Sequence, residues 1–238
     1  MATLRGKKVV VIGGTSGIGL AVAGAALADG AKVVVASSNQ ANVDTAVKEL
    51  GSGASGAALD VKNEGDLKRF FGDVGSFDHL VYTAGDWGPR GSVAFADIDL
   101  AAAANAFTIR FWGALAAIKH GHGQIVTGGS VVLTDGLLGH RPQKGAAVMS
   151  AMLGGIEHLT RSLAVELAPL RINAVCPGLI LTDRNKKIPE EMLKRWTGTA
   201  PLPRAGEPAE VAEAYLYLMR GGFTTGQVLF VDGGRTLV

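Results

Sequence analysis

Short apolar and β-branched runs alternate along the chain with longer segments of helical character. The apolar runs predict strands at Val9–Ile12, Lys32–Ala36, Ala57–Leu59, His79–Tyr82, Ser130–Thr134, Ile172–Cys176 and Val228–Val231. The segments between them predict helices over Ile18–Ala28, Gln40–Leu50, Glu64–Phe71, Asp97–Lys119, Ala147–Ala168 and Pro208–Met219. Several runs are apolar at every position, which is typical of parallel strands covered on both faces. The pattern predicts an α/β fold, a doubly wound parallel sheet of about seven strands with helices on both faces.

Local signals mark helix ends and the extent of the domain. Gly30 follows the first predicted helix, and Glu207 with Pro208 opens the last one. The segment Leu181–Pro203 has no regular period and carries scattered proline and charge, so we expect a mobile flap over a pocket there. No repeat or low-complexity linker divides the 238 residues, which predicts a single domain over 1–238.

Composition narrows the functional classes. The 23 basic and 21 acidic side chains give a net charge of +2, too small and too dispersed for a nucleic-acid surface. Cys176 is the one cysteine, which excludes a disulfide framework and a Cys-rich metal site and fits a reducing, cytoplasmic compartment. We expect no metal. We also expect no membrane association, because no leader segment and no uninterrupted membrane-length apolar run is apparent.

A glycine-rich turn follows the first predicted strand. The sequence Gly13-Gly14-Thr15-Ser16-Gly17-Ile18-Gly19 joins that strand to the first helix. Glycine lets the backbone approach a pyrophosphate, and a helix N-terminus offers free N–H groups with a favourable dipole. In this position the turn predicts a Rossmann-like dinucleotide site formed by Gly13, Thr15, Ser16, Gly17, Ile18 and Gly19.

The end of the second strand indicates which dinucleotide binds. NAD-preferring sites place an acidic residue here to bind the ribose hydroxyls. This chain has Ser37, Ser38 and Asn39 instead, three short polar side chains that do not repel a 2′-phosphate. We therefore expect NADP(H) in preference to NAD(H). The alternative is a plain polar loop with weak selectivity.

Further motifs carry a resemblance to a known family. They are Gly13–Gly19, Asp60-Val61, Thr83-Ala84-Gly85, Arg161–Pro169, Ile172–Gly178 and Gly226–Gly234. Over essentially its whole length the chain resembles the short-chain dehydrogenase/reductase family, which usually reads Asn-Ala-Gly where this chain has Thr83-Ala84-Gly85. The resemblance implies that Asp60 and Val61 contact the adenine. It also implies that Pro177, Gly178, Ile180 and Thr182 line the nicotinamide side.

The residues that carry the family's chemistry are replaced in this chain. The family uses an Asn, a Ser, and a Tyr followed four residues later by a Lys; the Tyr acts as general acid/base and the Lys lowers its pKa. By resemblance Gly136 stands at the Ser position, Met149 at the Tyr position, Leu153 at the Lys position and Arg110 at the Asn position. No shift of frame restores the pair, because no Tyr occurs between Tyr82 and Tyr215.

Other polar residues lie near the vacated positions. Asp135 ends the fifth predicted strand, where open α/β sheets bind ligands, and we interpret it either as an active-site carboxylate or as a turn-capping residue. Arg110 is expected in a buried helix, where a lone charge is costly, so we expect an Arg110–Asp135 pair as the catalytic candidates. Asp86, His140 and Arg141 are interpreted as solvated loop residues. Trp87, Trp112 and Trp196 either wall a substrate pocket or pack structurally.

A carboxylate without a Tyr suits some reductions better than others. At about 4 Å and a dielectric of about 20, a carboxylate opposes a forming alkoxide by roughly 4 kcal/mol. That is about a thousandfold in rate, unless the carboxyl is protonated or neutralised. Hydride transfer to an iminium instead consumes a positive charge. We therefore expect NADPH-dependent reduction of a C=N group or of a carbonyl in a small organic substrate.

A divergent branch of the family is similar in lacking the Tyr and Lys. It comprises the fungal indole-alkaloid reductases/Diels–Alderases of the malbrancheamide and paraherquamide pathways, which also read Ile-Arg where this chain has Ile109-Arg110. The likeness does not transfer a substrate. Two other classes stay open: a non-redox, cyclase-like enzyme that holds a reactive cation, and an inactive dinucleotide-binding or regulatory protein. The resemblance also implies a homodimer or homotetramer, formed through the helices at Asp97–Lys119 and Ala147–Ala168.

Overall fold

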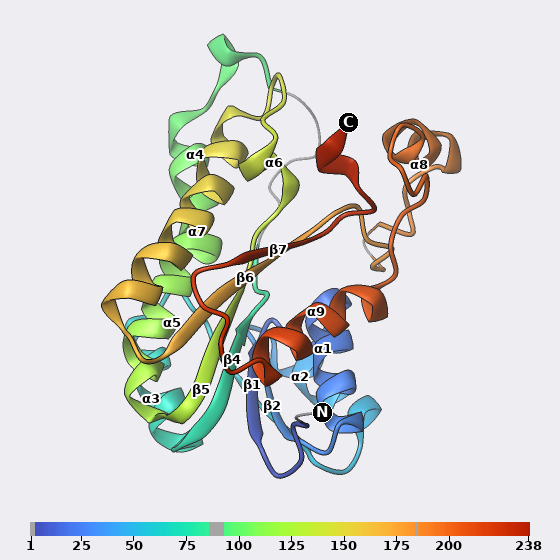
Figure 1. Cartoon of the computed structure of the whole chain (residues 1–238). Helices are drawn as coiled ribbons and strands as arrows, with labels where there is room; N and C mark the ends of the chain where they lie inside the picture. The colour runs from blue at the N-terminus through green and yellow to red at the C-terminus, as the bar shows by residue number, and fades with distance from the viewer. Residues whose placement is uncertain (1–2, 86–92, 184) are drawn as a thin grey trace.

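The computed structural model describes residues 3–85, 93–183 and 185–238, and in this part of the chain seven strands form one parallel sheet. The strands run in the order β3-β2-β1-β4-β5-β6-β7 (Figure 1). Their bounds are β1 Lys8–Ile12, β2 Lys32–Ser37, β3 Ala54–Ala58, β4 Phe77–Tyr82, β5 Ile125–Thr134, β6 Arg171–Pro177 and β7 Val228–Val231. The predicted doubly wound α/β fold is confirmed.

Two layers of helices cover the sheet, and the alternation of strand side chains decides which residues meet which layer. Val9 and Val11 point to one face, and Val10 and Ile12 to the other. The first face packs against α1 (Gly17–Ala28), α2 (Gln40–Leu50) and α9 (Pro208–Arg220). The second packs against α3 (Glu64–Val74), α5 (Gly113–Gly121) and α7 (Ala147–Glu166). Because both faces are buried, the central strands read as continuous apolar runs.

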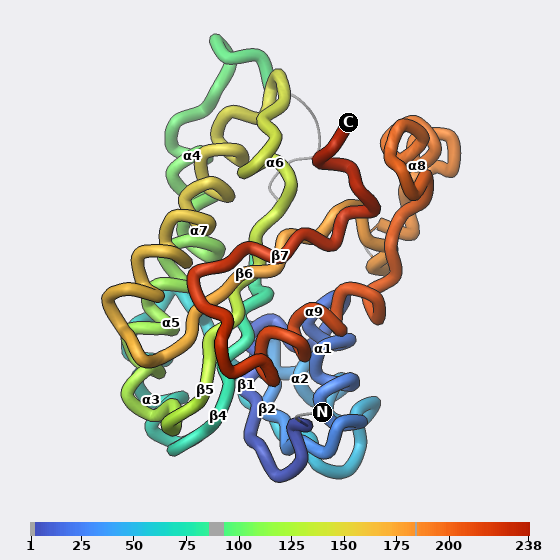
Figure 2. The backbone as a smooth tube through the Cα atoms, in the orientation of Figure 1, coloured from blue at the N-terminus to red at the C-terminus, as the bar shows by residue number. Residues whose placement is uncertain are grey.

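The strand order reverses between β1 and β4, which places a crevice at the carboxyl edge of the sheet. The chain runs outward from β1 to β3 and then returns to pair β4 with β1. In open α/β sheets the ligand binds at this switch point. Figures 1 and 2 show α4 (Leu100–Phe107) and α6 (Leu137–His140) beyond this edge on one side, and α8 (Glu190–Thr197) on the other.

Several element boundaries differ from the sequence predictions. β3 begins at Ala54 rather than Ala57, because its small residues pair with β2 along Val33–Ser37 without showing a β-branched pattern. The helix predicted over Asp97–Lys119 is divided into α4, a π-helical turn at Thr108–Trp112, and α5. The buried residue of this turn is Arg110.

The region predicted as irregular, Leu181–Pro203, contains helix α8. This helix is eight residues long and mostly exposed, and its apolar stripe consists of Met192, Leu193 and Trp196, so the pattern is too short to stand out among the surrounding proline and charge. The predicted helix ends at Gly30 and Glu207 are confirmed: Gly30 follows α1 with φ +88°, and Glu207 caps α9 with Pro208 in its first turn.

One helical run in the described residues, Leu100–Gln124, is long and apolar enough to cross a membrane by length and composition alone. This run contains Arg110 and Lys119, so it is not the uninterrupted apolar run whose absence the sequence predicted. A helix that packs against a sheet passes the same test, and α5 within this run packs on α3 and β5.

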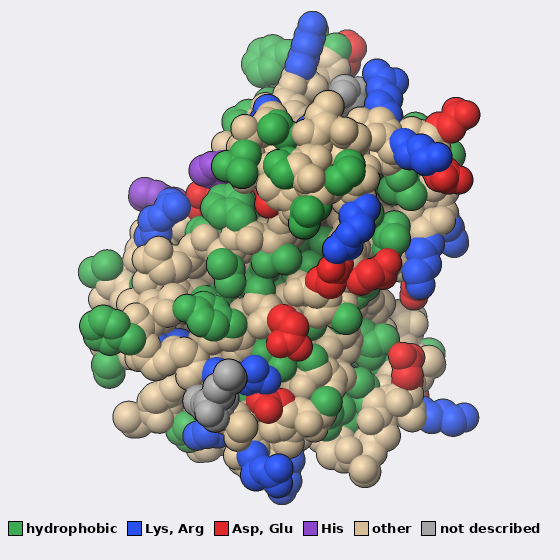
Figure 3. All heavy atoms as spheres, turned by 45° about the vertical axis from the view of Figure 1, so that its right-hand side comes forward, with side chains coloured by type: hydrophobic (Ala, Val, Ile, Leu, Met, Phe, Trp, Pro, Cys, Tyr) green, Lys and Arg blue, Asp and Glu red, His purple; other side chains and the backbone are tan. Residues whose placement is uncertain are grey.

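Figure 3 shows Lys and Arg side chains interspersed with Asp and Glu over one face of the molecule.

Candidate cofactor cradle and active site

The glycine-rich turn is packed too tightly for side chains. A β-carbon on Gly13 would lie 2.5 Å from the Ala84 nitrogen, and Gly13 itself has φ +87°. A β-carbon on Gly19 would overlap the carbonyl oxygen of Gly13. The backbone of the turn therefore stands open toward a ligand, as a pyrophosphate requires.

The N-terminus of α1 opens onto this turn. Ser16 is the N-cap residue, and its side chain makes no capping hydrogen bond to the first-turn N–H groups. Gly17 has φ +52°, and a β-carbon there would lie 3.0 Å from Thr182 Cγ2. The structure thus brings Thr182, more than a hundred residues away in sequence, to the turn. Unsatisfied helix N–H groups beside a side-chain-free backbone fit an anionic dinucleotide.

The residues at the end of β2 are short and polar. Ser37 is half-buried, whereas Ser38 and Asn39 are exposed. Asn39 Oδ1 accepts a hydrogen bond from the Asn42 N–H at 3.2 Å and so caps α2. The Asn39 amide nitrogen and the two serine hydroxyls are the donors that face outward, and this fits a ribose phosphate better than a bare ribose.

Two turns hold the other residues predicted at the cofactor. Thr83 and Ala84 both donate their N–H groups to the Ile12 carbonyl oxygen, at 2.8 and 3.2 Å, which fixes the exit of β4 beside the glycine turn. Val61 is buried, and a β-carbon on Gly113 would lie 3.0 Å from its Cγ2. Asp60 Oδ1 accepts from the Lys62 N–H at 3.0 Å.

Beyond β6, the backbone is tied to the C-terminal strand. Gly178 donates its N–H to the Val231 carbonyl oxygen at 2.9 Å, directly after Pro177. Ile180 pairs with Gly206 in a parallel bridge, and Asn185 Nδ2 donates a hydrogen bond to the Ile180 carbonyl oxygen at 2.8 Å. Residues from the turns after β1, β4 and β6 therefore converge on one edge of the sheet.

Arg110 lies at this edge as well. It is 2% exposed, and its Nη1 is 3.5 Å from the Thr134 carbonyl oxygen. Its guanidinium lies against Gly85, where a β-carbon would be 2.6 Å from Arg110 Cζ. Because Gly85 follows Ala84 at the glycine turn, Arg110 joins the cofactor cradle to the end of β5.

Asp135 directly follows β5 and is fully buried, with 0% exposure. Thr134 faces α9, where its Oγ1 is 2.7 Å from Tyr215 Oη, so alternation directs Asp135 to the α7 face. Neither carboxyl oxygen of Asp135 has a hydrogen bond of normal length and angle, so no hydrogen bond joins it to Arg110. Burial, and then the nearby charge of Glu157, raises the pKa of Asp135 to about 7 despite a lowering effect from the Gly136 N–H.

The residues predicted at the family's catalytic positions are Gly136, Met149 and Leu153. Gly136 caps the N-terminus of α6 with extended backbone, at φ −171° and ψ 153°. Met149 is half-buried on α7, and Leu153 is fully buried one turn later. None of the three side chains can exchange a proton.

Glu157 is a functional candidate that the sequence reasoning missed. It is 8% exposed on α7, and its Oε2 accepts from Arg161 Nη2 at 3.3 Å. It lies four residues after Leu153, on the same helix face. A carboxylate on the helix face that carries Leu153, Ile156 and Leu163 was the available signal.

The remaining candidates are more exposed or lie elsewhere. His140 is an exposed residue 3.9 Å from Glu157 Oε1, and Arg141 Nη1 donates to the Arg235 carbonyl oxygen at 2.8 Å. Trp112 and Trp196 are 57% and 45% exposed. Asp86 and Trp87 lie outside the described residues. Within residues 3–85, 93–183 and 185–238 no group of three or more His, Cys, Asp or Glu is placed to hold a metal ion.

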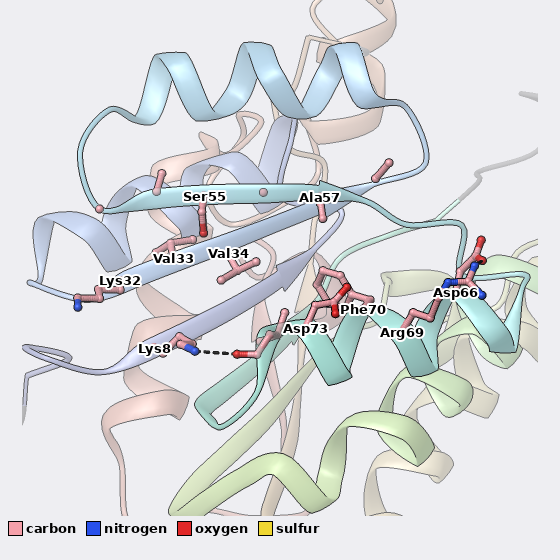
Figure 4. Close-up of a pocket in the computed structure, with 15 residues that line it drawn as sticks. Lys8, Lys32, Val33, Val34, Ser55, Ala57, Asp66, Arg69, Phe70 and Asp73 are labelled. Carbon is pink, nitrogen blue, oxygen red and sulfur yellow. Dashed lines mark hydrogen bonds and ion pairs between the residues drawn. The ribbon is translucent and has the colours of Figure 1, made fainter.

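Of two surface hollows in the described part of the chain, the smaller adjoins the cradle. The larger, about 750 Å³, lies between β3 and α3 (Figure 4). Two of its cations are already engaged, since Lys8 Nζ donates to the Val74 carbonyl oxygen and Arg69 pairs with Asp66. The smaller, about 620 Å³, is lined by Gly17 and Thr182 among others. The chemistry therefore points to the carboxyl edge rather than to the larger hollow.

Comparison with known proteins agrees with this geometry. The profile of a family described as enoyl-(acyl carrier protein) reductase matches residues 13–236. The chain is 35% identical to the short-chain dehydrogenase/reductase ATR9 of Stachybotrys chlorohalonatus, with 100% of both chains covered. The structure of MalC reductase/Diels–Alderase from Malbranchea aurantiaca is 32% identical with a TM-score of 0.90, covering 99% of this chain and 98% of that one. A small-chain dehydrogenase in complex with NADPH is 34% identical with a TM-score of 0.81, covering 98% of this chain and 100% of that one. The chain belongs to the short-chain dehydrogenase/reductase family.

Proposed function

We propose that this protein is an NADP(H)-dependent reductase with a non-standard active site, which reduces a C=N or carbonyl group of a small organic substrate. The observation that carries the proposal is the continuity from the glycine turn through Gly85 and Arg110 to Thr134 and Asp135. It puts the two candidate catalytic residues beside the cofactor cradle. The NADPH complex of a similar dehydrogenase supports the choice of cofactor.

The chain's own residues divide the work of binding. Gly13, Gly17 and Gly19 with the first turn of α1 would hold the pyrophosphate, and Ser37, Ser38 and Asn39 the ribose phosphate. Asp60 and Val61 would flank the adenine, and Thr83–Gly85 with Pro177, Gly178, Ile180 and Thr182 the nicotinamide. When bound, NADPH supplies the hydride.

We assign Asp135 the role of proton donor to the substrate. With its pKa raised to about 7, it is an acid over much of the neutral range and does not oppose an alkoxide in that form. The electrostatic argument for iminium over carbonyl substrates therefore holds above about pH 7 and loses force below it. Asp135 and Gly136 are both buried, so proton transfer to a bound substrate requires the turn after β5 to open at Gly136, which carries no side chain.

Arg110 is assigned a positioning role next to Asp135. Its guanidinium is held between Gly85 and the Thr134 carbonyl oxygen, so it fixes the backbone on both sides of the reacting position. Its positive charge also stabilises negative charge that develops on a substrate oxygen.

NADPH consumption with matched cyclic imines and ketones tests the proposal. We expect turnover of at least one class by the wild type, and at least a tenfold loss in Asp135→Asn. Tight NADPH binding without turnover of either class would contradict it and favour a non-redox, cyclase-like enzyme or a regulatory dinucleotide-binding protein.

We further propose a homodimer or homotetramer in the cytoplasm. Leu100 on α4, Trp112 on the π turn and Val165 on α7 are large apolar residues that are exposed on the helices named for such contacts. Light scattering of the purified protein tests the assembly; a monomer at micromolar concentration would contradict it.

A further inference from the structure

We infer that Asp135 and Glu157 form a carboxyl pair that holds one proton, and that Glu157 thereby keeps Asp135 in its acid form as a positioning residue for the reduction. The catalytic consequence rests on the proposed function. The shared proton itself is a property of the folded chain and can be measured without a substrate.

The fold brings Asp135 and Glu157 into the same buried region between β5, α6 and α7. Asp135 follows β5 and is tied to β6 by the hydrogen bond from its N–H to the Val175 carbonyl oxygen at 2.8 Å. Residues 136–140 then press on α7, where a β-carbon on Gly139 would lie 2.7 Å from the Gly154 nitrogen. Glu157 occupies the next turn of that helix and faces the same interior.

The buried oxygens of this pair have few other polar groups to stabilise them. Both Asp135 oxygens and Glu157 Oε1 are buried, and none of the three has a hydrogen bond of normal geometry. Two ionised carboxylates in such a place would repel each other and lack solvation. One proton on the pair removes most of that cost, as in other like-charge carboxyl pairs.

Arg161 forms an ion pair with one of the two carboxyls, since its Nη2 is 3.3 Å from Glu157 Oε2. In the described part of the chain no ion pair involves Asp135. The proton therefore belongs mainly to Asp135, and the neighbouring negative charge at Glu157 makes that proton harder to lose.

The other groups around the pair do not replace this effect. Cys176 on β6 touches Asp135, but burial raises the pKa of its thiol, so it stays uncharged. His140 on α6 approaches Glu157 Oε1 at 3.9 Å and is half-exposed. Asp232, beyond β7, lies near Cys176; Tyr215 on α9 lies on the other face of β5, and Arg110, from the π turn that packs beside α7, contacts the Thr134 carbonyl oxygen.

The proton balance of the reduction follows. For a carbonyl substrate, the hydride forms the new C–H bond, the Asp135 O–H bond breaks, and its proton goes to the substrate oxygen. For a neutral imine, the same proton goes to nitrogen, and the hydride then reduces the iminium carbon. A proton from water restores the pair, with half-exposed His140 as the group nearest to solvent.

Titration of the side-chain carboxyl carbons tests the pair directly. We use the full-length protein labelled with ¹³C at aspartate carboxyls and assign the Asp135 signal with Asp135→Asn. In the wild type we expect Asp135 to titrate near neutral pH. In Glu157→Gln the midpoint should fall by about one unit or more, because the like charge is gone. In Arg161→Gln it should instead rise, because the positive charge that offsets the Glu157 carboxylate is lost and its full negative charge then acts on Asp135.

The controls separate the pair from general changes in charge or folding. Glu166→Gln removes the same charge from an exposed position of α7 and should leave the Asp135 midpoint in place. Arg161 is itself half-exposed, so its variant tests the pair without opening the core. A wild-type midpoint in the ordinary carboxyl range, or an unchanged midpoint in Glu157→Gln, would overturn the inference.

Kinetics then tests the catalytic consequence. With the best substrate, the pH above which kcat declines should move down in Glu157→Gln and up in Arg161→Gln, in step with the carboxyl titration. Shifted midpoints with no turnover in the wild type would sink the reductase proposal and leave the shared proton standing. A shifted midpoint with an unmoved pH profile would refute Glu157 as a positioning residue.

Discussion

The guanidinium of Arg110 lies flat against Gly85, so closely that a β-carbon on residue 85 would be 2.6 Å from Cζ and 2.8 Å from Nε. Glycine at this position is therefore a packing requirement of the buried arginine. The contact also joins the turn after β4 to the π turn that follows α4, two segments separated in sequence.

Gly85→Ala is expected to displace Arg110. The added methyl cannot be accommodated without moving a buried guanidinium, so we expect about 1–3 kcal/mol of lost stability and at least a tenfold loss of reductase activity. Denaturant unfolding and NADPH consumption measure the two effects. Gly72→Ala on α3 is the control: nothing lies within 4 Å of its new β-carbon, and alanine should stabilise that helix by up to about 1 kcal/mol. Unchanged activity in Gly85→Ala would contradict a role for Arg110.

Gly19→Ala is expected to weaken cofactor binding. Its β-carbon would overlap the Gly13 carbonyl oxygen and push the glycine turn out of shape, so NADPH affinity should fall at least tenfold. Fluorescence titration with NADPH measures the dissociation constant. Gly24→Ala lies on the same helix and meets only Leu50 Cδ2 at 3.8 Å, so its affinity should match the wild type. Equal losses in the two variants would point to a general defect of α1.

Ser38→Asp tests the choice between NADPH and NADH. A carboxylate at the end of β2 repels a 2′-phosphate and binds ribose hydroxyls, so the ratio of NADPH to NADH affinity should fall at least tenfold. The uncharged Ser38→Asn separates charge from size and should keep the wild-type preference. If the ratio does not change in Ser38→Asp, this end of β2 does not contact the ribose.

Asp135 is expected to make stability depend on pH. Its folded pKa of about 7 lies above the ordinary value of 3.8, so its contribution is fully present below about pH 4 and is lost as pH rises through about 7. As pH rises across that window, the free energy of unfolding of Asp135→Asn should increase relative to that of the wild type by a few kcal/mol, at about 1.4 kcal/mol per pKa unit. Urea unfolding at a series of pH values measures the difference, with exposed Asp97→Asn as control. A constant difference would show that Asp135 does not titrate there.

His79 is expected to give folding stability the opposite dependence on pH. Burial lowers its pKa from 6.5 to about 4, and its Nδ1 is 2.9 Å from Ser130 Oγ inside the sheet. Because the folded state binds the proton less tightly, this stability is present above about pH 6.5 and is lost as pH falls toward 4. His79→Gln should lose less stability than the wild type over that range. Exposed His158→Gln should follow the wild type, and a His79 variant that does the same would contradict the prediction.

Sequence patterns fixed the parts of the fold that depend on local chemistry. Apolar β-branched runs marked five of the seven strands of the described sheet near their observed bounds, because a strand buried on both faces must be apolar throughout. The other two strands begin before their predicted starts, β5 at Ile125 and β3 at Ala54. The glycine turn was evident because glycine alone tolerates φ +87° at Gly13 in a space that has no room for a β-carbon. The prediction that no Tyr and Lys stand at the family's catalytic positions likewise rests on the sequence alone.

Contacts between distant segments decided the rest. β3 is built from small residues whose pairing with β2 sets its start, and Arg110 is reached by a π turn that a helical period does not reveal. The sequence suggested an Arg110–Asp135 pair. In the structure, Arg110 instead contacts Thr134 and Gly85, and Asp135 lies beside Glu157. Strand alternation, helix packing and burial select such partners, and these act only when the chain is folded. The fold class and the local turns could thus be predicted from the sequence. The electrostatic partners of the buried charged groups were determined by the tertiary structure.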